Sequence, residues 1–242
     1  MVDAATQRTN MVESQVLTSD VTDHRIVRAM RELPRERFVP PPLASLAYMD
    51  EAVPLTSPGR GSRWLLAPRV EAKLLQLADV GEEDHVLDVG SATGYSAALL
   101  GRIARSVIAL ECNGLLADQA RQNLADLGIS NVALTSGAFT AGWPVKAPYD
   151  AIIVQGSISV RPEDLLDQLK DGGRLVAIVN ENGIGEATIW RRLGRSMDSR
   201  VAFDATAPEL PTFEKAPAFV LSSCRRWREC GRQKSAFCQC FR

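Results

Sequence analysis

The chain has 242 residues, of which 45% are apolar and 24% charged, a composition typical of globular proteins and too apolar for wholesale disorder. Its formal net charge of -1 argues against binding to phosphates through an overall basic field, so no nucleic-acid partner is expected. No stretch approaches the ~20 continuous apolar residues of a spanning helix, and the polar start does not resemble a signal peptide. We therefore expect no membrane association and a cytoplasmic location.

The first predicted element is an amphipathic helix over 22–33, with Thr22 as its N-cap and Pro34 just past its end. Its apolar residues recur at helical spacing: Ile26, Val27, Met30 and Leu33. A proline-rich turn and an irregular stretch then continue to about Pro68. Such a long structureless segment inside a compact domain is usually functional, so we expect it to carry a substrate loop.

From residue 70 onward, short β-rich runs alternate with helical patterns, which predicts βαβ units and a parallel sheet with helices on both faces. The predicted strands are 85–89, 106–110, 132–135, 149–154 and 174–179. The predicted helices are at about 70–79, 95–104, 114–127 and 162–170. Two-residue alternation then predicts antiparallel strands over 187–193 and 216–221 that complete the sheet. The fold class is therefore α/β, with a Rossmann-like sheet.

The last part of the chain differs from the rest. Residues 222–242 carry six basic residues against one acid and hold four of the five cysteines, Cys224, Cys230, Cys238 and Cys240. A zinc knuckle is one interpretation, but the cysteine spacing fits no common ligand pattern, so we expect no metal. We predict a single domain over 1–221, made of a helical and substrate-loop segment (1–69) and a cofactor-binding core (70–221), followed by a disordered tail.

The strongest chemical signal follows the strand predicted at 85–89. Small residues form the turn that leads into the next helix: Gly90, Ser91, Ala92 and Gly94. A glycine turn between a strand and a helix lets the backbone approach a ligand closely. The turn lacks the dinucleotide fingerprint, and its acid, Asp88, precedes the first glycine, which favours S-adenosyl-L-methionine over NAD. Glu111, about twenty residues later, ends the next strand and can accept both ribose hydroxyls. The alternative is a plain α/β sheet with a tight turn and a surface glutamate.

Read with the N-terminal segment, these residues resemble the protein-L-isoaspartate (D-aspartate) O-methyltransferases, over roughly residues 10 to 220. The stretch Pro34-Arg-Glu-Arg-Phe-Val-Pro40 is specific to that family, whereas the glycine turn is shared by many methyltransferases. Further similar stretches are Met11-Val-Glu-Ser-Gln15, Ala47-Tyr-Met-Asp-Glu-Ala-Val-Pro54, Gly142-Trp-Pro and Leu169-Lys-Asp-Gly-Gly-Arg-Leu-Val176.

The resemblance implies a class I methyltransferase fold and the transfer of a methyl group from S-adenosyl-L-methionine to isoaspartyl carboxylates of damaged proteins, so the implied partner is a protein or peptide. Asp88, Gly90 and Gly94, with Ser91 between them, would hold the methionine end of the cofactor. Glu111 would hold its ribose, and Gln155 would lie beside the site.

Two departures from the family pattern weaken this implication. Aligned on Pro68, the family serine associated with activity is replaced by Leu66, so the catalytic residue is unknown. The acid expected near the adenine amino group is replaced by Ala138. The chain is therefore predicted to be an isoaspartyl methyltransferase with weakened activity and weakened cofactor binding. The alternatives are a cofactor-binding relative that has lost catalysis and a methyltransferase with another substrate.

Several single residues have both a chemical and a structural interpretation. His24 and His85 could be bases, but each is more simply part of a helix or strand. Cys112 follows Glu111 and is expected to behave as a small buried apolar residue rather than a nucleophile. Trp64 and Arg69 flank position 66 and could line a substrate mouth, although Trp64 could equally cover the core. Asp150 is expected to be a structural residue at a strand end.

Overall fold

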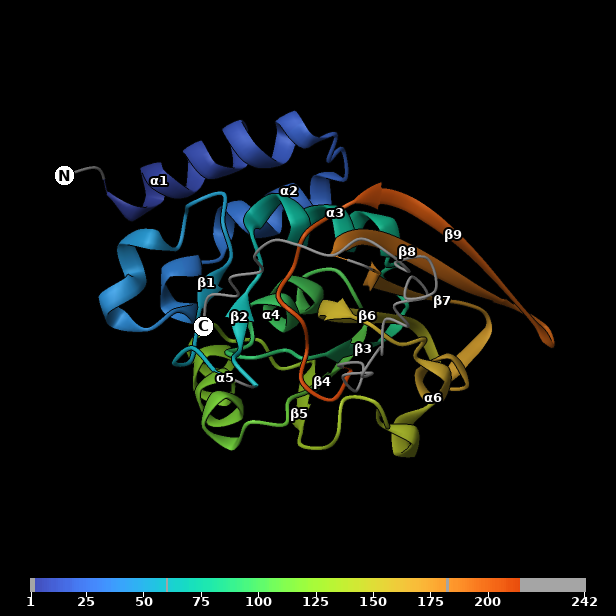
Figure 1. Cartoon of the computed structure of the whole chain (residues 1–242). Helices are drawn as coiled ribbons and strands as arrows, with labels where there is room; N and C mark the ends of the chain where they lie inside the picture. The colour runs from blue at the N-terminus through green and yellow to red at the C-terminus, as the bar shows by residue number, and fades with distance from the viewer. Residues whose placement is uncertain (1–2, 60, 182, 214–242) are drawn as a thin grey trace, which may run out of the picture.

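A computed structural model of the chain describes residues 3–213 apart from 60 and 182 (Figure 1). Its centre is a seven-stranded sheet in the order β5-β4-β3-β6-β7-β8-β9. The strands are β3 (His85–Val89), β4 (Ser106–Leu110), β5 (Val132–Thr135), β6 (Tyr149–Ile158), β7 (Leu169–Glu181), β8 (Ile184–Leu193) and β9 (Ser196–Asp204). Strands β3 to β7 run parallel, and β8 and β9 are antiparallel. The predicted Rossmann-like α/β sheet with C-terminal antiparallel strands is confirmed.

The central strands β3, β4 and β6 are buried on both faces: alternate residues point to opposite sides, and nearly all of them are buried. Val86 packs in one apolar cluster with the helices of the N-terminal half, and Leu87 packs in a second cluster with the short helix α6. The helices are α1 (Ala4–Met11), α2 (His24–Glu32), α3 (Pro68–Ala78), α4 (Tyr95–Gly101), α5 (Gly114–Asp126) and α6 (Glu163–Leu166). Figure 1 shows α1 and α2 stacked outside α3 on the first face.

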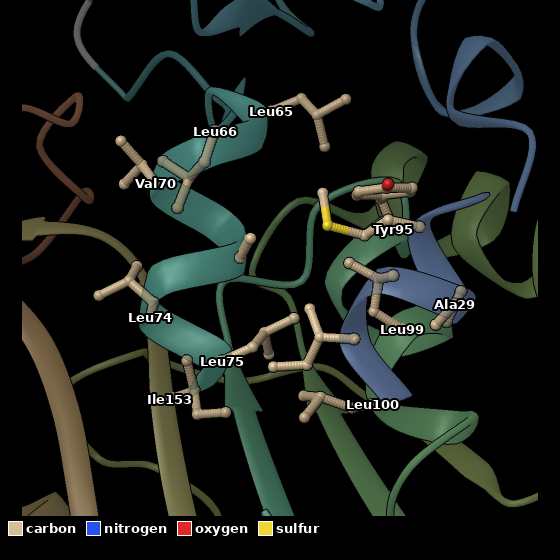
Figure 2. Close-up of a cluster of buried hydrophobic side chains, with 14 of the residues drawn as sticks. Ala29, Leu65, Leu66, Val70, Leu74, Leu75, Tyr95, Leu99, Leu100 and Ile153 are labelled. Atoms are coloured by element: carbon tan, nitrogen blue, oxygen red, sulfur yellow. The ribbon is translucent and has the colours of Figure 1, made fainter. Parts of the chain in front are cut away.

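The first face has a continuous core in which α3 and α4 pack side by side on the strands. Figure 2 shows Leu75 of α3 facing Leu99 and Leu100 of α4, with Ile153 of β6 below, whereas Leu74 points to the other side of α3. All of these side chains are at most 2% exposed. Burying a leucine of this kind contributes about 1.5–3 kcal/mol, so this core fixes the two helices that flank the crevice above the strand ends.

The segment predicted to be irregular, up to Pro68, contains ordered pieces. Two 3-10 turns, Arg35–Phe38 and Pro41–Leu46, precede a two-stranded antiparallel ribbon of β1 (Val53–Pro54) and β2 (Trp64–Leu65). Leu55 donates its amide proton to the Arg63 carbonyl at 2.8 Å, which extends the ribbon by one pair. The ribbon places the Arg63 side chain at the carboxyl ends of β3 and β4, where it contacts Gly90 and Glu111.

Some predicted boundaries are wrong. The helix predicted at 162–170 ends at Leu166, since β7 already begins at Leu169 and pairs with β6. The cap of α2 is Asp23, whose carboxylate accepts the Arg25 amide proton at 2.8 Å, and not Thr22. The strand predicted at 216–221 and the tail 222–242 lie outside the described residues.

Candidate functional site

The loop between β3 and α4 forms a cradle of main-chain atoms. Gly90, Ala92 and Gly94 have φ angles of 84°, 50° and 93°, a region that glycine occupies at no steric cost. The Gly94 amide closes the turn by donating to the Ser91 carbonyl at 2.8 Å. The cradle lies beyond the carboxyl end of β3, next to β6, where the strand order reverses; open α/β sheets bind their ligands in that crevice.

Glu111, directly after β4, places a buried carboxylate against this cradle. It accepts hydrogen bonds from the amides of Ala92 at 2.7 Å and of Cys112 and Asn113, both at 3.1 Å. Its side chain is fully buried. The predicted proximity of Glu111 to the glycine turn is therefore found in the structure.

Asp88 lies beneath the cradle between two side-chain donors. Ser96 Oγ donates to it at 2.6 Å and Gln155 Nε2 at 2.8 Å. Burial raises the pKa of Asp88 to about 6, although the two hydrogen bonds act in the opposite direction. Gln155 Oε1 and Ser91 Oγ are buried without a hydrogen-bond partner, and such atoms mark places where a ligand can supply one.

The predicted cofactor-binding residues thus gather at one edge of the sheet: Asp88, Gly90, Ser91, Gly94, Glu111 and Gln155. They come from the ends of β3, β4 and β6 and from the loops that follow. Their convergence comes from the parallel topology, because the carboxyl ends of parallel strands meet at the same edge.

Arg63 is a residue of this site that the sequence analysis missed. Its guanidinium is 3% exposed and pairs with Glu111, with Nε 3.3 Å from Oε1 and Nη2 3.1 Å from Oε2. Nη2 also donates to the Gly90 carbonyl at 2.7 Å. The guanidinium carbon lies 5.0 Å from the centre of the Phe139 ring. No sequence signal distinguishes an arginine in an irregular loop, and only the fold reveals its partners.

The segment after β9 closes the crevice further. Leu210 donates its amide proton to the Ser157 carbonyl at 2.9 Å, and its side chain is 1% exposed. A Cβ atom on Gly90 would lie 2.9 Å from Arg63 Nη2 and 3.0 Å from a Leu210 methyl carbon. Arg63 and Leu210 therefore fill the space that Gly90 leaves open.

The open main chain of the loop 90–94 and the position of the Glu111 carboxylate are suited to S-adenosyl-L-methionine. In this structure, however, the Glu111 carboxylate is paired with Arg63. Ala138 is exposed, whereas Phe139 beside it is fully buried. The cofactor would thus be held by the loop 90–94 and Glu111 once the Arg63 side chain has moved.

Leu66 is buried beside this crevice. Figure 2 shows it with Leu65 and Val70 where α3 begins. Its side chain is 2% exposed and lines a small closed space with Arg63 and Gln155. Its carbonyl accepts a hydrogen bond from the fully buried Arg35. Position 66 is therefore next to the site and has an apolar side chain.

A second buried polar cluster lies under the first turn of α3. Glu71 is 2% exposed and its Oε1 has no partner, as is also true of Arg35 Nη1 and the Tyr95 hydroxyl. The Arg35 guanidinium lies 4.7 Å above the Tyr95 ring. Burial, with a smaller contribution from Asp88, raises the pKa of Glu71 to about 8, so the folded protein holds this carboxyl protonated at neutral pH.

This cluster predicts that stability falls with rising pH. The folded state keeps the Glu71 proton up to about pH 8, whereas the unfolded chain releases it above about 4.3. The free energy of unfolding should therefore drop by up to about 1.4 kcal/mol per pH unit across this window. Replacing Glu71 with glutamine should remove its contribution to this pH dependence. The free energy of unfolding of the variant should then decrease only up to about pH 6, through the raised pKa of Asp88. Urea titrations of wild type and Glu71→Gln from pH 5 to 8 measure it.

The control for this prediction is Glu32→Gln, because Glu32 is 52% exposed in its ion pair with Arg28. That variant should keep the pH dependence of the wild type. Equal slopes for wild type and Glu71→Gln would show that Glu71 titrates in the folded protein much as it does in the unfolded chain.

His85 and Asp150 have structural roles at the start of β3 and β6. The amide of His85 donates to Asp150 at 2.9 Å, and its ring contacts Ser106 Oγ at 2.7 Å. Asp150 also pairs with Lys170 at 2.9 Å, in agreement with the structural role expected for it. His24 is the first residue of α2. Cys112 is exposed and not buried as expected. Partial burial of its thiol and the neighbouring Glu111 raise the pKa of that thiol, which disfavours it as a nucleophile.

An open groove of about 900 Å³ lies beside the closed crevice. Trp64 and Arg69 both line it. Its rim carries side chains of both charges, and Arg69 Nε lies 3.3 Å from Asp50 Oδ1. The groove is large enough to receive a segment of another chain.

Among the described residues, no three or more His, Cys, Asp or Glu side chains are grouped so that they could hold a metal ion. The four tail cysteines lie outside these residues. None of the described helices has the length and apolar character needed to cross a membrane.

Comparison with known proteins agrees with the geometry. The family model of protein-L-isoaspartate(D-aspartate) O-methyltransferase matches residues 6–205. A protein-L-isoaspartate O-methyltransferase of Rhodopseudomonas palustris is 45% identical over 167 residues, which cover 69% of this chain and 74% of that protein. One of Methanoregula boonei is 37% identical over 188 residues, which cover 78% of this chain and 85% of that protein.

Solved structures give the same result. A protein-L-isoaspartate O-methyltransferase structure superposes with a TM-score of 0.73 at 25% identity, over 84% of this chain and 65% of that chain. A Plasmodium falciparum structure described as a protein of this kind, in complex with S-adenosyl-L-homocysteine, superposes with a TM-score of 0.70 at 20% identity. It covers 87% of this chain and 99% of that chain, and at this identity it supports the fold alone.

Proposed function

This chain belongs to the protein-L-isoaspartate O-methyltransferase family, and we propose that it transfers the methyl group of S-adenosyl-L-methionine to isoaspartyl carboxylates of damaged proteins or peptides. The observation that carries the proposal is the extent of the family match. It runs over residues 6–205 and so includes both the cofactor cradle and the N-terminal segment beside it.

The proposed roles follow from the geometry of the cradle. The loop 90–94 would receive the methionine part of the cofactor, with Asp88, Ser91 and Gln155 close to it. Glu111 would accept the ribose hydroxyls. When bound, the cofactor supplies an electrophilic methyl group on a positively charged sulfur.

The chain has little chemistry of its own to perform in this reaction. A substrate carboxylate already carries the negative charge of a nucleophile, so no base has to remove a proton. The enzyme has to exclude water and align the two reactants, and such positioning can lower a barrier by about 7–11 kcal/mol. The open groove lined by Trp64 and Arg69 is where we place the peptide.

The test is transfer of labelled methyl from S-adenosyl-L-methionine to a synthetic isoaspartyl peptide. We expect base-labile label in the peptide, and none in the same peptide with a normal aspartyl linkage. Cofactor binding is measured beside it by calorimetry. Label in both peptides or in neither, with measured cofactor binding, would contradict the isoaspartyl substrate.

The second candidate is a family member that binds the cofactor and has lost this transfer. It is favoured by Leu66, which offers no hydroxyl beside the crevice. Binding without transfer to any isoaspartyl peptide would support it. We also propose a cytoplasmic location, because Cys112 forms no disulfide within the described part of the chain; cell fractionation would check it.

A further inference from the structure

We propose that Arg63 is an internal latch on the cofactor site: its guanidinium occupies the ribose-binding position at Glu111 and has to leave before the cofactor can bind. This inference rests on the proposed function, because it assumes that Glu111 is the ribose acceptor. It concerns a residue outside the glycine turn and the altered serine position.

The first support is that the Glu111 carboxylate has no free acceptor capacity. Oε1 receives the amides of Cys112 and Asn113 and the Nε of Arg63, and Oε2 receives the Ala92 amide and Arg63 Nη2. A carboxylate offers about four lone-pair positions. These five N–H donors, together with the weak donor Cys112 Sγ at 3.7 Å, therefore saturate the carboxylate. The two ribose hydroxyls would need the two places that the arginine now takes, so the arginine has to leave for both to bind.

The second support is where the rest of the guanidinium lies. Nη2 bonds the Gly90 carbonyl at 2.7 Å, and the group stacks over Phe139 at 5.0 Å. A Cβ atom on Gly90 would lie 2.9 Å from Nη2. The Arg63 side chain thus fills the space that the missing Cβ atom of Gly90 leaves open, where a ligand would otherwise approach the main chain.

The third support is the way Arg63 is held. Its amide donates to Thr56 Oγ1 at 2.9 Å and its carbonyl accepts the Leu55 amide at 2.8 Å. Its main chain thus belongs to the ribbon of β1 and β2, which packs outside the main sheet. Movement of this ribbon, or rotation of the arginine side chain, would open the crevice without disturbing the strands that carry Asp88 and Glu111.

The latch makes a prediction about affinity that can be measured without turnover. Calorimetry with S-adenosyl-L-homocysteine should show that Arg63→Gln binds at least about tenfold more tightly than wild type, since a neutral amide competes less well for a carboxylate. Arg63→Lys keeps the charge but loses the two-pronged pairing, so its affinity should lie between the two. Arg37→Gln, which breaks an exposed pair with Asp126, should bind as wild type does.

Thermal unfolding provides a second readout. Without ligand, Arg63→Gln should melt below wild type, because Glu111 stays buried without its cation. Saturating S-adenosyl-L-homocysteine should then raise its melting temperature by more than it raises that of wild type. Arg63→Lys serves the same comparison if the glutamine variant does not fold.

The outcomes separate the latch from the function. Equal or weaker binding by both Arg63 variants overturns the latch; weaker binding would make Arg63 a residue that holds the cofactor. If the variants gain affinity but no form methylates an isoaspartyl peptide, the latch stands and the proposed substrate falls.

Discussion

Replacing Gly94 with valine is expected to abolish cofactor binding and to lower stability by about 2–5 kcal/mol. Gly94 has φ +93°, and a Cβ atom there would lie 3.0 Å from Ala120 Cβ and 3.3 Å from its Cα. The strained backbone and the contact with α5 would displace the loop 90–94 from its place beside Glu111. Calorimetry with S-adenosyl-L-homocysteine and urea unfolding measure the two effects.

The matched control for this prediction is Gly114→Val at the start of α5. A Cβ atom there meets nothing within 4 Å, and no left-handed φ is involved. That variant should bind S-adenosyl-L-homocysteine with nearly the affinity of wild type and have nearly the same free energy of unfolding. Retained binding in Gly94→Val, in protein shown to be folded, would mean that the glycine turn does not form the cofactor cradle.

The central strands were predictable from the sequence because their patterns are strong. The bounds of β3, β4 and β5 are as predicted: each strand is short and bounded by turn residues, and β3 and β4 are almost wholly buried. In contrast, α1 was missed because its sequence is mostly polar and only Met11 is buried. β9 was missed because most of its side chains are exposed and carry no apolar alternation.

The candidate site was predictable where the chemistry follows a strand end. Asp88, Gly90 and Glu111 stand at fixed offsets from β3 and β4, so their convergence could be inferred from the order of strands alone. Arg63 stands 48 residues from Glu111, in a loop without periodicity. Its pairing depends on how the ribbon folds over the sheet, and no local pattern encodes that.

Under the proposed function, three features of this chain would act on the site in the same direction. Ala138 would leave the adenine amino group without an acceptor, Arg63 pairs with the carboxylate proposed as the ribose acceptor, and Leu66 places an apolar side chain beside the crevice. The first two would weaken cofactor binding, whereas the third would act on an anionic substrate. They can therefore be separated by experiment, because a change at position 66 should affect transfer more than cofactor affinity.

Replacing Leu66 with serine is expected to raise kcat/KM on an isoaspartyl peptide by the equivalent of about 1–3 kcal/mol. Leucine desolvates a carboxylate without offering it a hydrogen bond, which is unfavourable for an anion. A hydroxyl in the small space lined by Gln155 and Arg63 would offer that bond. The rates are measured for wild type and variant on one peptide at saturating cofactor.

The gain in activity should come with a loss in stability. Leu66 is 2% exposed, so shortening it should cost about 2–5 kcal/mol. Leu65→Ser is the matched control, because Leu65 is 5% exposed in the same apolar cluster (Figure 2) but does not line the space with Gln155. It should lose comparable stability and gain no activity. If both variants lose stability and neither gains activity while the cofactor still binds, the missing hydroxyl is not what limits transfer, and a different substrate becomes the better explanation of position 66.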